Sequence, residues 1–153
     1  MQQRPAATRS PTEGWVAQQL REATPFGEGP KYIIRDNDLK FGMPRTGQFD
    51  RVAQGCDIKV LHTPPKSPLC NSFCERFLGS VRRECLDHIV ILSEGHLRRV
   101  ILEYVHYFNE SRPHQGIGQK VPRPMKVPGD EINREVVELS ILGGLHHEYR
   151  RAA

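Results

Sequence analysis

A strand, a helix and a second strand follow one another within residues 31–62, and this succession constrains the fold more than any other feature. Residues 31–35 are a short β-rich run bounded by turn residues, which predicts a buried strand. Residues 48–54 carry apolar side chains at helical spacing before Gly55, and residues 57–62 predict another strand. Strands joined by so short a helical crossover favour a right-handed βαβ unit with parallel pairing.

Two longer helices are predicted downstream, at about residues 71–86 and 93–109, and a short one at 15–23. On a helical wheel of about 100° per residue, the first long helix carries its apolar stripe apart from the face of Glu75. That stripe comprises Cys74, Phe77, Leu78, Val81 and Cys85. The fold class is therefore α/β, with a βαβ unit and two long helices.

The chain has 153 residues, enough for one domain with a modest core. Its formal net charge of +4 and pI near 9.0 are compatible with a polyanionic partner but do not require one. The sequence has no apolar run as long as a membrane span and begins without a signal-peptide core. We expect a cytoplasmic protein that does not enter membranes.

The cysteines are expected to be reduced and structural. A zinc site built from Cys70, Cys74, Cys85 and His88 is conceivable, but the sequence has no Cys-x-x-Cys pair to begin one. Cys74 and Cys85 instead fall on the predicted apolar stripe, where free cysteine behaves as a small buried hydrophobe.

The candidate catalytic residues are two carboxylates, Asp36 and Glu75. An aspartate that leaves the carboxyl end of a parallel strand lies where α/β folds bind ligands, although Asp36 could equally be an ordinary turn residue. Asp38 fits the turn better. Glu75 could simply belong to a solvated charge pattern with Arg82 and Arg83. Two such carboxylates could hold divalent metals, which prefer oxygen ligands.

Basic residues are numerous around these carboxylates. They could be solubilising, or they could contact phosphates. His114, after Arg112 and Pro113, could be a loop histidine without a role. The basic set comprises Lys66, Arg76, Arg82, Arg83, Arg98 and Arg99.

Three motifs together resemble the integrase-core (retroviral-integrase-like, DDE) transposases of bacterial insertion sequences. Residues 33–42 (IIRDNDLKFG) look like the strand and turn of that family's second catalytic aspartate. Residues 65–79 (PKSPLCNSFCERFLG) are similar to the loop and helix of its catalytic glutamate. Residues 107–115 (YFNESRPHQ), followed by Pro122, look like its closing element. Asp36 and Glu75 lie 39 positions apart, close to the family's usual interval.

The resemblance implies an RNase H-like fold and metal-dependent phosphoryl transfer on DNA. Asp36 would be the second and Glu75 the third carboxylate of the triad, and together they would bind Mg²⁺ or Mn²⁺. The DNA end would lie near Lys66, Asn71 and Arg76, with Arg82 and Arg83 farther along the same face.

The sequence departs from the family at the first catalytic aspartate. No aspartate precedes Asp36, and the acidic residues there, Glu13, Glu22 and Glu28, do not fall on a predicted strand. We therefore expect an N-terminally truncated fold that lacks its first three strands and is inactive alone. Its parts would be a disordered lead-in (1–13), a partial catalytic core (14–124) and an extended C-terminal tail (125–153).

Three functions remain open at this point. The first is an inactive transposase catalytic remnant with DNA as its partner. The second is a non-enzymatic DNA-binding or assembly module, which would form homo-oligomers or pair with a full-length transposase through the unpaired edge of the strand at 31–35. The third is a small metal-dependent nuclease that uses Asp36, Asp38 and Glu75. The sequence alone does not decide whether the chain is an enzyme.

Overall fold

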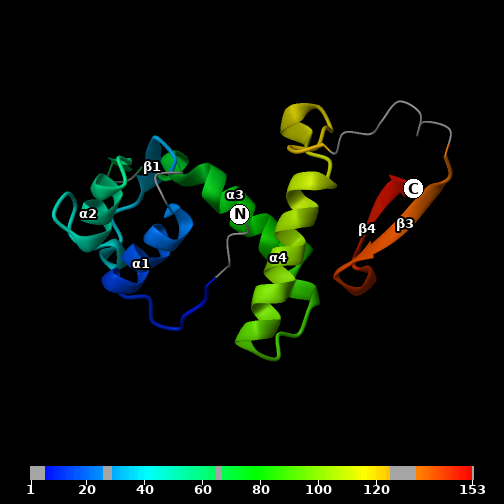
Figure 1. Ribbon diagram of the computed structural model, residues 1–153, viewed down its shortest axis with the longest axis horizontal. Coiled ribbons are helices and arrows are strands. Elements are labelled where there is room, and N and C mark those ends of the chain that lie inside the picture. The colour runs from blue at the N-terminus through cyan, green and yellow to red at the C-terminus, as the bar shows by residue number, and fades with distance from the viewer. Residues whose placement is uncertain (1–5, 26–28, 65–66, 125–133, 153) are drawn as a thin grey trace. The chain divides into compact units, whose positions relative to one another are not determined.

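The computed structural model describes residues 6–25, 29–64, 67–124 and 134–152, and the chain divides into two compact units (Figure 1). Unit 1 is Met1–Leu78 and unit 2 is Gly79–Ala153. Helix α3, Ser72–Glu84, crosses the boundary between them. Unit 1 contains α1 (Glu13–Ala23), β1 (Tyr32–Arg35), α2 (Gln48–Gly55) and β2 (Lys59–His62), and unit 2 contains α4 (Glu94–Glu110), β3 (Val136–Ile141) and β4 (His146–Arg151).

The predicted parallel strand pair is confirmed. Strand β1 pairs with β2 in parallel, with Ile33 opposite Val60 and Arg35 opposite His62, and α2 connects the two strands. The helices at 15–23, 48–54, 71–86 and 93–109 are also confirmed, within a few residues at each end. The mixed helix and sheet composition agrees with the α/β class.

The prediction that residues 31–35 form a buried strand was wrong for one face. Ile33 packs against the hydrophobic core and Arg35 is buried, but Tyr32 is 48% and Ile34 52% exposed. Leu61, opposite Ile34 on β2, is also exposed. Side chains alternate between the faces of a sheet, so a two-stranded sheet with its core on one face leaves alternate residues in solvent.

The core of unit 1 lies between α1, α2 and the inner face of this sheet. Its buried members are Ala17, Leu20, Phe49, Val52, Ala53 and Ile58. The amino end of α2 has no side-chain cap from Gly47, and instead the Glu13 carboxylate accepts a hydrogen bond from Gln48 N. Helix α1 thus contributes to the core and also caps α2.

In unit 2, the end of α3 and helix α4 carry the buried side chains. Ser93 caps α4 by accepting a hydrogen bond from His96 N, and Val100 and Tyr104 are buried farther along that helix. On α3 the predicted apolar stripe is only partly confirmed. Val81 is buried, and so is Cys85 just beyond the helix, whereas Cys74 and Leu78 are exposed. The expectation that Cys74 is a buried hydrophobe was therefore wrong.

The C-terminal region, where we expected an extended tail at 125–153, contains two paired strands. Strands β3 and β4 form an antiparallel hairpin in which Ile141 pairs with His146. The turn uses Gly143 and Gly144 at φ angles of 68° and 95°, a left-handed region that glycine adopts without steric cost. Leu142 and Glu148 are buried, so this hairpin belongs to unit 2.

Several earlier expectations fall on residues outside the described ranges, including residues 1–5 of the lead-in and 125–133 of the tail. Within the described ranges, none of the helices is both long enough and apolar enough to cross a bilayer.

Candidate metal and DNA site

Asp36 follows directly after β1, at the carboxyl end of the parallel sheet. Thr63 N donates to Arg35 O at 3.0 Å, and the Asn37 side chain donates to Thr63 O at 3.0 Å, so the two strands remain joined beyond their ends. Asp36 is half-buried, and its Oδ1 accepts a hydrogen bond from Asp38 N at 3.2 Å. Asp36 therefore occupies the position at which such sheets bind ligands.

Asp38 caps the short 3-10 helix η2 (Leu39–Phe41). Its carboxylate accepts a hydrogen bond from Lys40 N and pairs with Lys40 Nζ, both at 2.9 Å. The backbone N–H and the side chain of Lys40 lower the pKa of the Asp38 carboxyl. The interpretation of Asp38 as the turn residue is thus confirmed.

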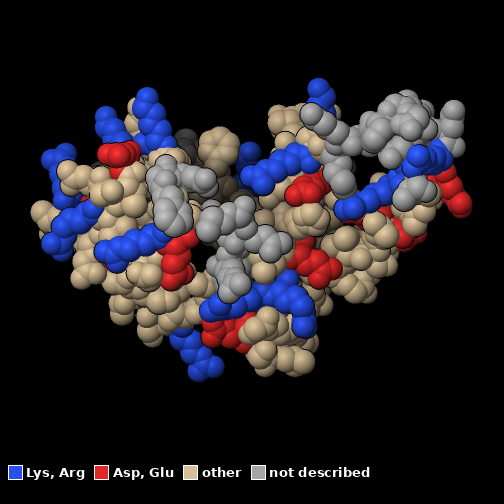
Figure 2. Space-filling view, viewed as in Figure 1, with Lys and Arg blue, Asp and Glu red and all other residues tan. Residues whose placement is uncertain are grey.

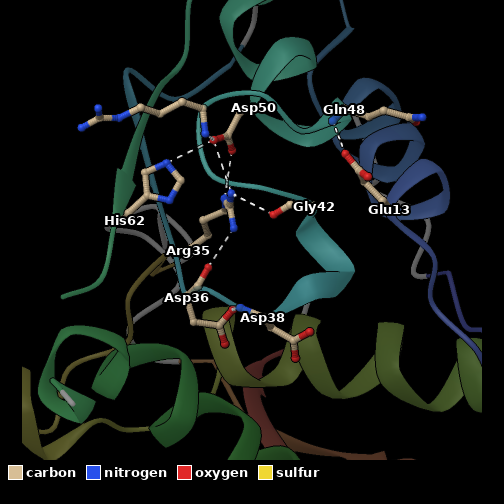
Figure 3. Close-up of polar contacts among 9 residues, drawn as sticks. Glu13, Arg35, Asp36, Asp38, Gly42, Gln48, Asp50 and His62 are labelled. Carbon is tan, nitrogen blue, oxygen red and sulfur yellow. Dashed lines mark hydrogen bonds and ion pairs between the residues drawn. The ribbon is translucent and has the colours of Figure 1, made fainter. Parts of the chain in front are cut away.

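A buried ion pair lies next to the backbone of Asp36 (Figure 3). Arg35 is 2% exposed and donates from Nε to Asp50 Oδ1 at 2.9 Å and from its second terminal nitrogen to Asp50 Oδ2 at 3.3 Å. The same guanidinium donates to Asp36 O at 3.0 Å and to Gly42 O at 3.5 Å. One side chain therefore contacts both ends of the turn that carries Asp36 and Asp38.

Asp50 receives two further contacts. Arg45 N donates to its Oδ2 at 2.5 Å, and His62 Nε2 lies 3.1 Å from the same oxygen. Burial acts to raise the pKa of the Asp50 carboxyl, but the hydrogen bonds from Arg35 and Arg45 outweigh it and the pKa is lowered. Asp50 is therefore an ionised carboxylate, and both of its oxygens are engaged within the protein. The Asp36 carboxylate, by contrast, accepts a hydrogen bond at Oδ1 from Asp38 N.

Sequence reasoning missed Arg35 and Asp50. The signal was present, because Arg35 lies two positions after the inward-facing Ile33 and so also points inward. A charged residue at an inward strand position requires a buried partner. Asp50 adjoins the core residue Phe49 on α2, but the sequence does not reveal that the two charges meet.

Glu75 lies in the first turn of α3 and is exposed. Across the described part of the chain, its carboxylate makes no hydrogen bond or ion pair. The guanidinium of its neighbour Arg76 lies 5.8 Å from the centre of the Phe73 ring. Glu75 is thus free to bind a ligand. Its exposure agrees with the prediction that it lies apart from the apolar stripe of α3, whereas the alternative pairing with Arg82 or Arg83 is not observed.

The predicted DNA-binding residues have different surroundings. Asn71 ends the 3-10 helix η3 (Pro68–Asn71) and is half-buried. Arg82 and Arg83 are exposed, and Arg82 Nε lies 3.5 Å from Asp87 Oδ1. Lys66 lies outside the described residues. On the face drawn in Figure 2, acidic side chains lie among the basic ones.

The donor chemistry of Asp36 and Glu75 fits Mg²⁺ or Mn²⁺, because both supply carboxylate oxygens that are not used by a cation of the described chain. The described residues do not contain a group of three or more His, Cys, Asp or Glu side chains that could hold a metal ion. No contact joins Asp36 to Glu75 among these residues. The two carboxylates are therefore candidate ligands, not an assembled centre.

The third motif, residues 107–115, has a structural role within unit 2. Arg112 makes a two-point ion pair with Glu84, with both nitrogen–oxygen distances 2.7 Å, and Tyr104 Oη donates to Glu84 Oε2 at 3.0 Å. Burial acts to raise the pKa of the Glu84 carboxyl, but Arg112 and Tyr104 lower it overall. Burial and the bond to Glu84 raise the pKa of Tyr104.

His114 also serves the fold. Its Nε2 lies 2.7 Å from Phe108 O and its ring packs edge-on against the Phe108 ring. A second histidine, His146, stacks on Tyr107 and contacts Glu84 O through Nε2 at 2.6 Å. These contacts join the end of α3, α4 and the hairpin within unit 2.

Comparison with known proteins agrees with the motifs. Residues 56–122 match the family model of the integrase core domain, a range that includes Glu75 but not Asp36. The chain is similar to the "Insertion element IS407 uncharacterized 31.7 kDa protein" of Burkholderia multivorans, at 30% identity over 108 residues, and to the "Insertion element IS476 uncharacterized 39.2 kDa protein" of Xanthomonas euvesicatoria, at 29% identity over 108 residues. These alignments cover 71% of this chain but 38% and 30% of the relatives. No solved structure matches the chain.

Proposed function

Because the chain belongs to the integrase-core family of insertion-element proteins, we propose that it carries part of a transposase catalytic site that acts on DNA by metal-dependent phosphoryl transfer. One observation carries this proposal. Asp36 leaves the carboxyl end of a parallel strand with a carboxylate that has no cationic partner in the described chain, and Glu75 lies free on a helix 39 positions later. The carboxylates of Asp50 and Glu84 differ from these two, because each forms an ion pair with an arginine, Arg35 and Arg112 respectively.

In this proposal Asp36 and Glu75 hold Mg²⁺ or Mn²⁺ through their carboxylate oxygens. The bound cation would supply an activated water or DNA 3′-hydroxyl and stabilise the leaving oxygen. Asp38 does not join them, because Lys40 already occupies its carboxylate. The RNase H-like topology and a catalytic core at 14–124 belong to the same proposal.

The first carboxylate of the triad has no counterpart among residues 1–35, which contain no aspartate. Glu13 hydrogen-bonds Gln48 N and caps α2, and Glu22 accepts a hydrogen bond from the Gln18 side chain within α1. We therefore propose that the 153-residue chain by itself does not turn over DNA, since losing one member of a catalytic unit costs several orders of magnitude in rate.

The substrate proposed is DNA, contacted by exposed arginines of α3. Arg76 and Arg83 are candidates because both are exposed and neither forms an ion pair with a described residue, and Arg82 would exchange its long contact with Asp87 for a phosphate. Asn71 and Lys66 would complete the contact near the DNA end.

DNA binding and turnover test this proposal together. The 153-residue chain should bind a labelled duplex end in a salt-sensitive manner, and Mn²⁺ held by Asp36 and Glu75 should tighten binding because it would add positive charge beside the DNA phosphates. Glu75→Gln and Asp36→Asn should each abolish the Mn²⁺ effect while leaving metal-free binding unchanged. An equal Mn²⁺ effect in all three proteins would contradict the proposed roles.

The same samples, assayed for end cleavage and strand transfer with Mn²⁺, should give no product. Product that forms and disappears in Glu75→Gln would contradict the proposed inactivity and favour a nuclease that uses only these carboxylates.

A second candidate function is a non-catalytic assembly module. The exposed outer face of the β1–β2 sheet, with Tyr32, Ile34 and Leu61, favours it because such apolar faces commonly bind partners. Sedimentation of the chain alone and with a full-length transposase distinguishes the two: concentration-dependent association abolished by Ile34→Lys supports the module, and a monomer in both experiments opposes it.

A further inference from the structure

We propose that Arg35 is the positioning residue of Asp36: its buried guanidinium fixes the turn that presents the carboxylate. This inference rests on the proposed metal-binding role of Asp36. The sequence motif indicates a role for Asp36 alone, whereas the contacts of the preceding residue, Arg35, indicate that it holds Asp36 in position.

The guanidinium of Arg35 contacts the turn at both ends. It donates to the carbonyl of Asp36, where the turn begins, and to the carbonyl of Gly42, where the turn ends. Since a guanidinium is planar and its N–H groups have fixed directions, these two carbonyls cannot move independently of each other. A lysine could donate to one carbonyl but could not also bind Asp50 through two nitrogens.

The other side of the guanidinium is held by Asp50 on α2. That carboxylate is buried, and it also accepts from Arg45 N and contacts His62 of β2. The Arg35 guanidinium carbon also lies over the Phe41 ring, 5.6 Å from its centre. Strand β1, the turn, α2 and β2 therefore converge on one ion pair (Figure 3).

Among the described residues, the Asp36 carboxylate accepts one hydrogen bond, from Asp38 N. Its orientation consequently depends on the backbone of residues 36–38, and Arg35 determines where that backbone begins. Residues that orient a metal ligand commonly change metal affinity by about 10-fold to 100-fold when altered. Arg35 acts on Asp36 in this indirect way and does not touch the metal.

The test is a Mn²⁺ titration of the ¹⁵N-labelled chain, followed by paramagnetic broadening of the Asp36–Asp38 amide signals. Arg35→Lys keeps the charge but loses the two-point geometry, and should raise the Mn²⁺ concentration for half-broadening about tenfold or more. The matched control is Arg51→Lys, which changes an exposed arginine next to Asp50 and should leave the titration unchanged. A folded Arg35→Lys protein with the wild-type titration would overturn the proposal.

A second measurement needs no variant. If the ion pair holds the turn, the amides of Phe41 and Gly42 should exchange with solvent through the same opening as the Cys56 amide at the end of α2. Turn amides that exchange through a separate, much easier opening would overturn the positioning role. Should wild-type Mn²⁺ broadening be absent at Asp36, the proposed function fails, yet this exchange experiment still decides the role of Arg35.

Discussion

Arg35 and Asp50 are 15 positions apart in the sequence and form a buried two-point ion pair inside unit 1. Each residue would be costly to bury alone, since an unpaired charge in a protein interior is strongly unfavourable. Together they join the strand that ends at Asp36 to helix α2. The pair therefore links the stability of unit 1 to the geometry of its candidate metal ligand.

The first prediction concerns the pH dependence of folding. The pKa of Asp50 is lowered below its ordinary value of 3.8 in the folded protein. Its stabilising contribution is therefore complete above the unfolded pKa and is lost as the pH falls through the folded pKa. Urea unfolding between about pH 3 and about pH 7 should show stability falling on the acid side.

Asp50→Asn isolates this contribution. Breaking one partner of a buried pair costs about 3–5 kcal/mol at neutral pH, and the variant should lose less additional stability in acid than the wild type. Equal acid sensitivity in both proteins would contradict the role assigned to Asp50.

The second prediction concerns the hydroxyl of Tyr104 in unit 2. Tyr104→Phe removes the hydrogen bond to Glu84 without leaving a cavity, and a bond to a charged group contributes about 1.5–3 kcal/mol. Thermal unfolding monitored by hairpin amide signals should detect the loss. Tyr149→Phe, which alters a 66% exposed tyrosine on β4, serves as the control and should leave the melting temperature unchanged.

The third prediction concerns Gly42. Its φ of 75° is left-handed, and an added Cβ would lie 2.1 Å from a Glu13 carboxylate oxygen. Gly42→Ala should destabilise the protein by more than about 1 kcal/mol, the usual cost of a left-handed non-glycine residue. Gly55→Ala is the matched control, because a Cβ there meets no neighbouring atom within 4 Å. Equal stability of the two variants by urea unfolding would argue against this turn geometry.

The fourth prediction concerns the four cysteines, which are all free. Cys70 and Cys74 are exposed and should react with a thiol reagent under native conditions. Cys85 is buried, and burial together with Glu103 raises its thiol pKa, so it should react only after unfolding. Mass spectrometry after timed alkylation measures the fraction of each cysteine that has reacted. Rapid native labelling of Cys85 would contradict its place in the core.

Much of the fold could be predicted from local patterns. A β-rich run bounded by turn residues located β1, a second strand-like run located β2, and helical periodicity located α2 and α4, because these patterns report directly on local backbone geometry. Periodicity was less informative at Cys74 and Leu78. The apolar stripe indicated which side of α3 is hydrophobic, but whether another element covers that side depends on tertiary packing.

The ion pairs could not be predicted in the same way. Arg35 with Asp50, and Glu84 with Arg112, join residues on separate elements, and the sequence carries no local record of that proximity. The hairpin was missed for a related reason, since the polar residues 146–151 read as a surface segment and the antiparallel register with β3 is a non-local property.

If Asp36 and Glu75 are the metal ligands of this chain, as proposed, both carboxylates bind the same cation. A Mn²⁺ titration of the ¹⁵N-labelled wild-type chain should broaden the amide signals around both residues at the same metal concentration. In Asp36→Asn and in Glu75→Gln, both sets of signals should require much more metal, because each carboxylate contributes to one site. Broadening centred on other acidic residues, or independent titration of the two positions, would contradict the account.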